Sequence, residues 1–250
     1  MREHFLISPP NKSIVERNIY ADKSAVILEW ILLKGIKNKD FSLREVALAT
    51  GVGVGSVHRV FESLVLKGYL QTIGIRTNKK FSVKNLSTLL SEWIKAYSLI
   101  KKCKMFAYST GFQNKEQLID TLLHSGLEEK VVLALHSSAD AHGCKNTNLQ
   151  QLELYMTQAN IRPKLEEILK LSPKERGYDV LLIEPYYKTI LKLDIARQKE
   201  HSKQPIFYAP ALLTFLDLYH FPLRGIEQAE SMARRILELN QIYKKGQQNE

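Results

Sequence analysis

The stretch that decides the fold is SLREVALATGVGVGSVHRVFESLVLKGYL, residues 42–70, which begins as a helix, breaks at three glycines and resumes as a helix. Ser42 and Glu45 form the S-x-x-E pattern of a capping box, which predicts a helix start near Leu43. Gly51 is typical of the residue that ends a helix, because glycine accepts a positive φ at little cost. Gly53 then stands where the next N-cap falls.

A second helix is indicated by the residues after these glycines. Apolar side chains recur there at helical spacing, at Val54, Val57, Val60, Phe61, Leu64 and Val65. With the apolar stretch SAVILEWILLKGIK that precedes residue 42, the pattern predicts helices at 24–36, 43–50 and 54–67. This is the order of a helix-turn-helix domain, in which the first helix supplies the core that holds the other two at their angle.

Two short runs of alternating apolar and polar residues follow Gly68, at Tyr69–Ile73 and Lys80–Val83, and a polar basic turn joins them. They predict a β-hairpin with a basic tip. A hairpin placed directly after the second helix is a wing. The stretch ATGVGVGSVHRVFESLVLKGYL resembles the pattern of bacterial winged-helix regulators, with a small-residue turn, V-x-R in the second helix and L-x-x-x-G before the wing.

The net charge of +10 lies entirely in the first part of the chain: residues 1–104 hold 18 Lys+Arg against 8 Asp+Glu, and residues 105–250 hold 18 against 18. Such an excess attracts a polyanion, and phosphate neutralisation releases counterions, so the charge favours nucleic acid. A solubilising surface or a patch for anionic lipid are the alternatives.

A broken helix lets the second segment present its first turn to the major groove of double-stranded DNA. Gly53 and Gly55 remove side chains that would hold the backbone away, Arg59 suits guanine or phosphate, and Ser56 suits a phosphate oxygen. The competing interpretation is that His58 and Arg59 are solvated surface residues. The predicted DNA contacts are Ser42, Arg44, Val54, Gly55, Ser56, His58, Arg59, Arg76, Asn78, Lys79 and Lys80.

The remaining composition predicts a cytoplasmic protein. The longest apolar runs are far shorter than the roughly 18–20 residues that span a bilayer, and the first residues lack the apolar core of a signal peptide. Cys103 and Cys144 are the only cysteines and form no CxxC motif, so neither a disulfide framework nor a thiolate metal site is expected.

Residues 86–104 are expected to form one amphipathic helix that links the two parts of the chain. Beyond it, strand and helix patterns alternate. The predicted strands are MFAYS, VVLAL, LELYM, YDVLLIEP and PIFYA, and the predicted helices are 114–125, 136–142, 162–171, 209–219 and 225–243. The predicted fold is α+β, with a winged helix-turn-helix domain and its extension at 1–85, the linking helix at 86–104 and a mixed α/β domain at 105–250.

This second domain offers little chemistry. It has no P-loop, G-x-G-x-x-G, H-E-x-x-H or G-x-S-x-G pattern. The spacings of His136, Asp140 and His142 do not place all three on one helix face, which favours buried or capping roles over a metal site. Tyr186, Tyr187, Phe207 and Tyr208 are more typical of a core than of a ligand pocket. We therefore expect no enzyme activity, no metal and no cofactor.

The stretch PALLTFLDLYHFPLRGIEQAESMARRILE, residues 210–238, resembles the end of the AbiEi family of winged-helix antitoxins and predicted regulators of phage defence. The resemblance rests on the order D-L, P-x-R-G and a spaced E-x-A pattern. These are Asp217, Leu218, Pro222, Arg224, Gly225, Glu227, Ala229 and Ile236. Upstream, ALHSSADAHG, LELYM and YDVLLIEPY stand in the order that the family uses. Arg224 is expected to pair with Asp217 or a carbonyl group and is not catalytic.

The resemblance implies a transcriptional repressor of a type IV toxin–antitoxin system that binds inverted repeats in its own promoter. It also implies a carboxy-terminal domain that counters a nucleotidyltransferase toxin without a stable complex. Three alternatives stay open. They are an effector-sensing regulator with a small-molecule pocket in the second domain, a plasmid replication or partition protein, and a degenerate nucleotidyltransferase.

Overall fold

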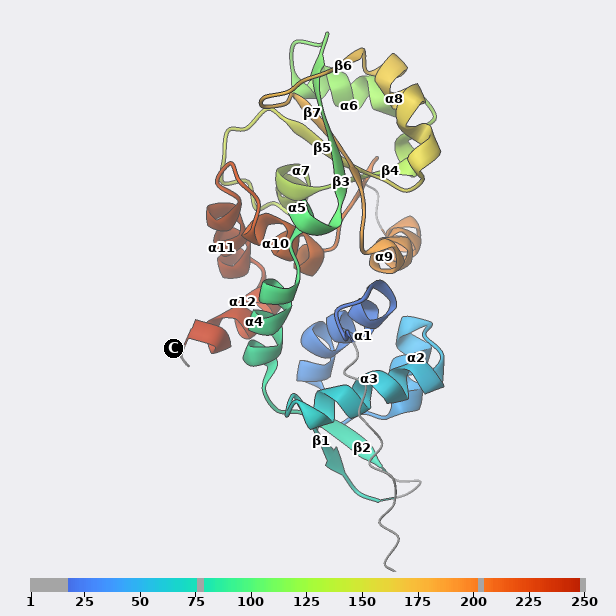
Figure 1. Ribbon diagram of the computed structural model, residues 1–250, viewed down its shortest axis with the longest axis vertical. Helices are drawn as coiled ribbons and strands as arrows, with labels where there is room; N and C mark the ends of the chain where they lie inside the picture. The colour runs from blue at the N-terminus through green and yellow to red at the C-terminus, as the bar shows by residue number, and fades with distance from the viewer. Residues whose placement is uncertain (1–17, 76–78, 202–204, 248–250) are drawn as a thin grey trace, which may run out of the picture.

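The computed structural model describes residues 18–75, 79–201 and 205–247. The molecule is elongated, with a helical amino-terminal part at one end and a sheet with its covering helices at the other (Figure 1). The mixed α/β composition predicted from the sequence is confirmed.

The amino-terminal helices are α1 (Asp22–Leu33), α2 (Leu43–Thr50) and α3 (Val54–Leu66), with a short 3-10 turn at Gly35–Lys37. The predicted capping box is present, because the Ser42 hydroxyl accepts from the Glu45 amide and the Glu45 carboxylate accepts from the Ser42 amide. Gly51 has φ +67° and ends α2, and Gly53 is the N-cap of α3. The three predicted helices are thus confirmed, with small shifts at their ends.

The predicted hairpin forms as two antiparallel strands, β1 (Leu70–Ile73) and β2 (Lys80–Val83). It is anchored to the helices by aromatic rings. Phe61 of α3 packs edge-on against Phe81 at 4.8 Å and against Phe41 at 5.9 Å between ring centroids. Edge-to-face pairs at these distances add stability beyond the buried area. The hairpin is therefore held at a fixed place beside α3.

The single helix predicted for residues 86–104 is wrong. The chain forms α4 (Leu86–Ala96) and a short α5 (Leu99–Lys102), and Tyr97 between them is extended, with φ −121° and ψ 136°. The break turns Tyr97 into the core, where its hydroxyl donates to Asp217 at 2.7 Å. This buried hydrogen bond stabilises the extended conformation at Tyr97.

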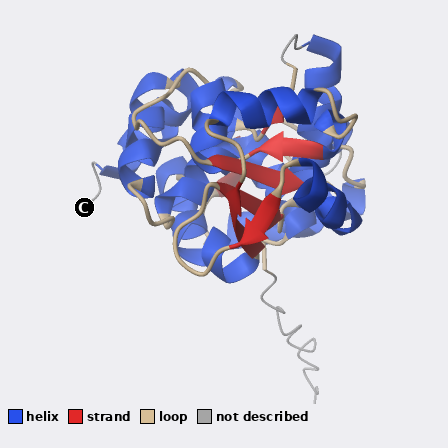
Figure 2. Ribbon diagram, turned by 90° about the horizontal axis from the view of Figure 1, so that it is seen from above, coloured by secondary structure: helices blue, strands red, loops and turns tan. Residues whose placement is uncertain are grey.

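The second part is built on a six-stranded sheet in the order β6-β3-β7-β5-β4-β8. Its strands are β3 (Lys104–Thr110), β4 (Val131–Leu133), β5 (Leu152–Met156), β6 (Leu171–Pro173), β7 (Val180–Glu184) and β8 (Phe207–Tyr208). Pairs β5–β7 and β4–β8 are parallel and the others antiparallel. Helices lie on both sides of this sheet (Figure 2).

Both faces of the central strands are buried, which explains their nearly continuous apolar sequences. Leu152, Leu154 and Met156 of β5 pack on the face covered by α6 (Lys115–Leu123) and α8 (Arg162–Ile168). Tyr155 points to the other face, toward α7 (Leu135–Ala141) and α10 (Ala211–Tyr219).

One helix was not foreseen, α9 (Lys188–His201), because its apolar residues do not form a single stripe. The helix predicted at 225–243 is divided at Ile236 into α11 (Gly225–Arg235) and α12 (Leu237–Gln247), since Ile236 is extended. The short edge strand β6 was also missed.

The two parts of the chain share one apolar cluster, which includes buried residues from Ile19 to Ile242. Helix α1 lies beside α9, and α4 lies beside α12 (Figure 1). Asp22 accepts hydrogen bonds from the Thr189 amide and hydroxyl at 2.9 and 2.6 Å. The expected domain division at 1–85, 86–104 and 105–250 stays a prediction, but packing joins its parts closely.

Candidate nucleic-acid interface

The outward face of α3 is determined by the side that the helix buries. The buried side chains are Val57, Val60, Phe61 and Leu64. Because they lie along one stripe, the opposite side is left to solvent. The exposed residues there include Gly55, His58, Arg59 and Glu62. The predicted contacts of α3 therefore lie on or beside its accessible side.

The first turn of α3 is open to close approach. A Cβ atom added at Gly53 or Gly55 would meet nothing within 4 Å. Val54 between them is 46% exposed. A flat molecular surface can reach the backbone at this turn without displacing a side chain.

Further along the same face the charge changes sign. Nδ1 of His58 lies 3.5 Å from Oε2 of Glu62, and both side chains are at least half exposed. The carboxylate of Glu62 repels phosphate, so the part of α3 suited to a polyanion is its first turn and a half.

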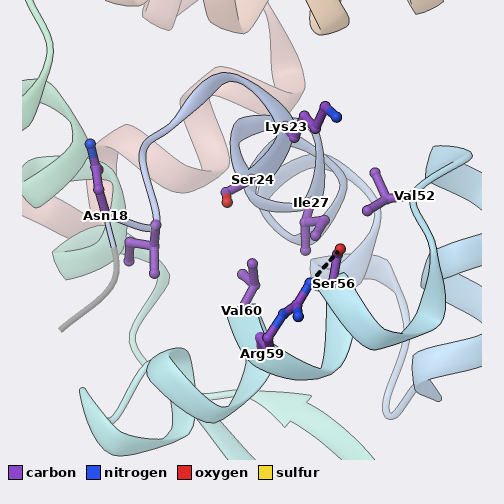
Figure 3. Close-up of a pocket in the computed structure, with 9 residues that line it drawn as sticks. Asn18, Lys23, Ser24, Ile27, Val52, Ser56, Arg59 and Val60 are labelled. Carbon is purple, nitrogen blue, oxygen red and sulfur yellow. Dashed lines mark hydrogen bonds between the residues drawn. The ribbon is translucent and has the colours of Figure 1, made fainter. Parts of the chain in front are cut away.

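A pocket of about 290 Å³ lies where α3 meets α1. Its lining includes Lys23 and Ser24 from α1 and Ser56 and Arg59 from α3 (Figure 3). Nη2 of Arg59 donates to the Ser56 hydroxyl at 3.1 Å. This bond uses one of the five N–H donors of the guanidinium group and holds its orientation. Hydroxyls and cations in this combination suit a phosphate oxygen.

Ser42 and Arg44 bring different properties to the start of α2. The oxygen and amide of Ser42 are both engaged in the capping box, which gives this serine a structural role. Arg44 is exposed, and no ion pair joins it to any residue that the structure describes.

The hairpin carries two lysines of unequal availability. Nζ of Lys80 lies 2.6 Å from Oδ1 of Asp40, and this bond and charge raise the pKa of Lys80. Lys79 is exposed, with its ammonium 5.4 Å from the Phe81 ring centroid. The predicted contacts Arg76 and Asn78 lie outside the described residues.

In the second part, the residues considered for a metal do not converge. His142 Nε2 lies 2.8 Å from the Ala209 carbonyl oxygen, and Asp140 pairs with Lys115 at 3.4 Å. His136 is buried beside the Phe221 ring at 6.4 Å between centroids. Within residues 18–75, 79–201 and 205–247, no three His, Cys, Asp or Glu side chains are placed to hold a metal ion.

Two fully buried carboxylates hold the sheet to its helices. Asp217 of α10 accepts from the Tyr97 and Tyr155 hydroxyls at 2.7 and 2.8 Å. Glu153 of β5 accepts from the Ser137 amide at 3.0 Å and from the Ser137 hydroxyl. Burial raises the pKa of Asp217 and of Glu153 to about 7, although the hydrogen bonds oppose the shift.

The four aromatic residues considered for a pocket are divided between two places. Tyr186 and Tyr187 stack with Tyr97, and the Trp93 indole donates to the Tyr187 hydroxyl at 2.7 Å. Phe207 and Tyr208 lie on the edge strand β8. The core interpretation holds for Tyr187, which is 1% exposed.

Residues 82–238 match the model of a family described as "Transcriptional regulator, AbiEi antitoxin, Type IV TA system". The chain belongs to the AbiEi family. The match spans more than half of this AbiEi protein and contains β3 to β8 with α4 to α11. No curated protein and no solved structure matches the chain. No helix in the described part is long and apolar enough to cross a membrane.

The AbiEi motif residues near the carboxy terminus form a helix joint. Arg224, with φ +65°, pairs with Glu227 at 2.6 Å, so its expected pairing with Asp217 or a carbonyl is wrong. A Cβ atom at Gly225 would lie 2.4 Å from the Leu218 carbonyl oxygen, so glycine allows α10 and α11 to approach closely.

Sequence reasoning missed Lys23 and Ser24 as members of the α1–α3 pocket. They stand at the start of the first predicted helix, far along the chain from the glycine turn, and only the crossing of α1 and α3 brings them to this pocket. A local pattern contains no signal for such a pair.

Proposed function

We propose that this AbiEi protein represses its own promoter by binding inverted repeats in double-stranded DNA through an amino-terminal winged helix. The observation that carries the proposal is the bare first turn of α3 beside a pocket with cationic and hydroxyl side chains. We propose a regulator that acts by binding, in the cytoplasm, and without catalysis.

In the proposed complex, the first turn of α3 enters the major groove, which is wide enough for a helix and displays distinct base edges. The backbone at Gly55 approaches the bases, with Val54 next to it and His58 almost one turn further along the helix. Val54 suits the methyl group of thymine, and His58 suits a base acceptor.

Phosphate contacts would come from both flanks of α3. On one flank Arg59, held by Ser56, faces a backbone oxygen, and Lys23 stands on the α1 side of the same pocket. On the other flank β1 and β2 act as the wing, with Lys79 as its available cation. The charge excess of residues 1–104 supports the same orientation, because counterion release favours binding at the basic end.

The decisive experiment measures promoter binding by Gly55→Leu and Arg59→Ala variants of the full chain. Gly55→Leu should fold normally, because the added side chain meets no atom at its base, and should lose specific binding. Arg59→Ala should weaken binding, by about 1–3 kcal/mol if it reads a base. Lys164→Ala on α8 removes an exposed cation of the second part and serves as the charge control.

A folded Gly55→Leu protein with parental affinity would refute α3 as the reading helix. If Lys164→Ala weakens promoter binding as much as Arg59→Ala does, only the net charge of the protein matters for binding.

We further propose that antitoxin action on a nucleotidyltransferase toxin requires no stable complex. Gel filtration of the full chain mixed with the product of an adjacent nucleotidyltransferase gene tests this. Separate elution of the two proteins, together with protection of cell growth from the toxin, supports the proposal. Co-elution of the two proteins at micromolar concentration contradicts it.

A further inference from the structure

A cleft of about 720 Å³ lies between α1 and α9, away from the outward face of α3. Its lining comes from both parts of the chain, since α1 and α2 lie outside residues 82–238 and α9 lies inside them. Helix α1 lies beside α9 where the two parts pack (Figure 1), so the lining residues place the cleft across this junction.

The floor of the cleft holds a carboxylate whose hydrogen-bonding capacity is unused. Glu29 is 7% exposed and accepts no hydrogen bond from any residue in the described part of the chain. Burial raises the pKa of Glu29 to about 7, Asp194 adds to the shift and Arg197 opposes it. The Glu29 oxygens open to the cleft and have no donor from the described residues, so a ligand that brings N–H groups would supply the hydrogen bonds that these residues do not.

The second carboxylate in the cleft already has a donor from the protein, since Oδ2 of Asp194 accepts from Nε2 of Gln198 at 2.6 Å. Glu29 is the carboxylate of this cleft with no donor at either oxygen from the part of the chain that the structure describes.

The walls are apolar and one of them is aromatic. Val26, Trp30 and Leu33 line the α1 side, and Pro210 lines the other. Trp30 is half-buried and is fixed by an edge-on contact with Phe41 at 5.1 Å between ring centroids. A fixed indole beside an open cleft offers a stacking surface for a flat ligand.

Cations surround the opening. Lys34, Arg197 and His201 are exposed and line the cleft. Lys34 and Arg197 form no ion pair with any described residue. Lys37, which also lines the cleft, is paired with Glu238 at 3.1 Å. An anionic group at the opening would find two cations that no ion pair within the described ranges holds in place.

We propose that the α1–α9 cleft binds a small molecule with a flat head that carries adjacent N–H donors and with an anionic tail, the class that contains the guanine nucleotides. The head lies against Trp30 with its donors on the Glu29 carboxylate, and the tail meets Arg197 and Lys34. Two adjacent donors match the two oxygens of a carboxylate, whereas adenine offers one donor next to an acceptor. This site is separate from the proposed DNA contacts, and its test does not involve DNA.

The first experiment is titration of the full chain with GMP, guanosine, ribose 5-phosphate and AMP, followed by calorimetry and tryptophan fluorescence. Trp30 and the fully buried Trp93 are the only tryptophans, so a change in emission reports on Trp30. GMP should bind, and each of the other three should bind at least tenfold more weakly. Failure of GMP to bind at millimolar concentration, or equal binding of AMP, would overturn the proposal.

The second experiment assigns the contacts. Glu29→Gln should weaken GMP at least tenfold and leave the melting temperature without ligand unchanged or higher, because the group has no internal donor to lose. Arg197→Ala should weaken GMP but leave guanosine unaffected, and Lys164→Ala should change neither. Parental GMP affinity in Glu29→Gln would show that the carboxylate is not the recognition group and would refute the proposed site.

Discussion

Gly225→Ala should destabilise the protein through a single added methyl group. The new Cβ would lie 2.4 Å from the Leu218 carbonyl oxygen and 3.0 Å from Cβ of Phe221. Carbon and oxygen ordinarily approach to about 3.3–3.6 Å, so α10 and α11 must separate by about 1 Å.

The size of the effect follows from what this separation disturbs. Overpacking a well-packed site costs about 1–3 kcal/mol. The Leu218 carbonyl also accepts from the Phe221 amide at 3.0 Å, and weakening that bond adds up to about 1 kcal/mol. Alanine recovers less than about 1 kcal/mol of helix propensity at the first position of α11. A net loss of about 2–3 kcal/mol should lower the melting temperature by about 4–12 °C in a chain of this size.

Differential scanning calorimetry of Gly225→Ala beside Gly55→Ala tests the argument. Position 55 is the matched control, because it lies inside a helix and an added Cβ meets nothing within 4 Å. Gly55→Ala should therefore melt at or slightly above the parental temperature. Equal melting of Gly225→Ala and the parent would show that α10 and α11 are not held at this distance.

Three further predictions concern charge and burial. The pKa of Asp217 in the folded state is raised to about 7. Its contribution to the free energy of unfolding is therefore complete below about pH 4. The contribution then falls by roughly 1.4 kcal/mol per pH unit as the pH rises to about 7. Asp217→Asn should flatten that decline in urea denaturation, and an unchanged pH profile would contradict it. Lys79→Ala should reduce the slope of the salt dependence of DNA binding by about one unit. Lys80→Ala should reduce it by less, because Asp40 already holds that lysine. Slopes equal to that of the parent in both variants would place the hairpin off the DNA. Trp93→Phe should lower the free energy of unfolding by about 1–3 kcal/mol, because the buried Tyr187 hydroxyl loses the indole N–H that it accepts from. A melting temperature equal to that of the parent would argue against this hydrogen bond.

The sequence predicted best the features that depend on neighbouring residues. The capping box of Ser42 and Glu45 and the positive φ of Gly51 are local requirements, so their spacing located α2 and the turn correctly. The short apolar runs of β5 and β7 likewise located two central strands.

Features that depend on distant residues could not be predicted in this way. The break at Tyr97 follows from the position of Asp217, which lies far along the chain. Helix α9 is stabilised against α1 and shows no stripe of its own. The α1–α3 pocket and the α1–α9 cleft combine residues that no local pattern relates, so Lys23 and Glu29 were not candidates for either site.

The apolar cluster that joins the two parts has a consequence for how this antitoxin is lost in a cell. Because buried residues from Ile19 to Ile242 belong to one cluster, opening of either part removes packing from the other, and the chain should unfold as one cooperative unit. A protease that captures the open chain would then remove the proposed promoter binding and the proposed toxin control together, with one lifetime for both.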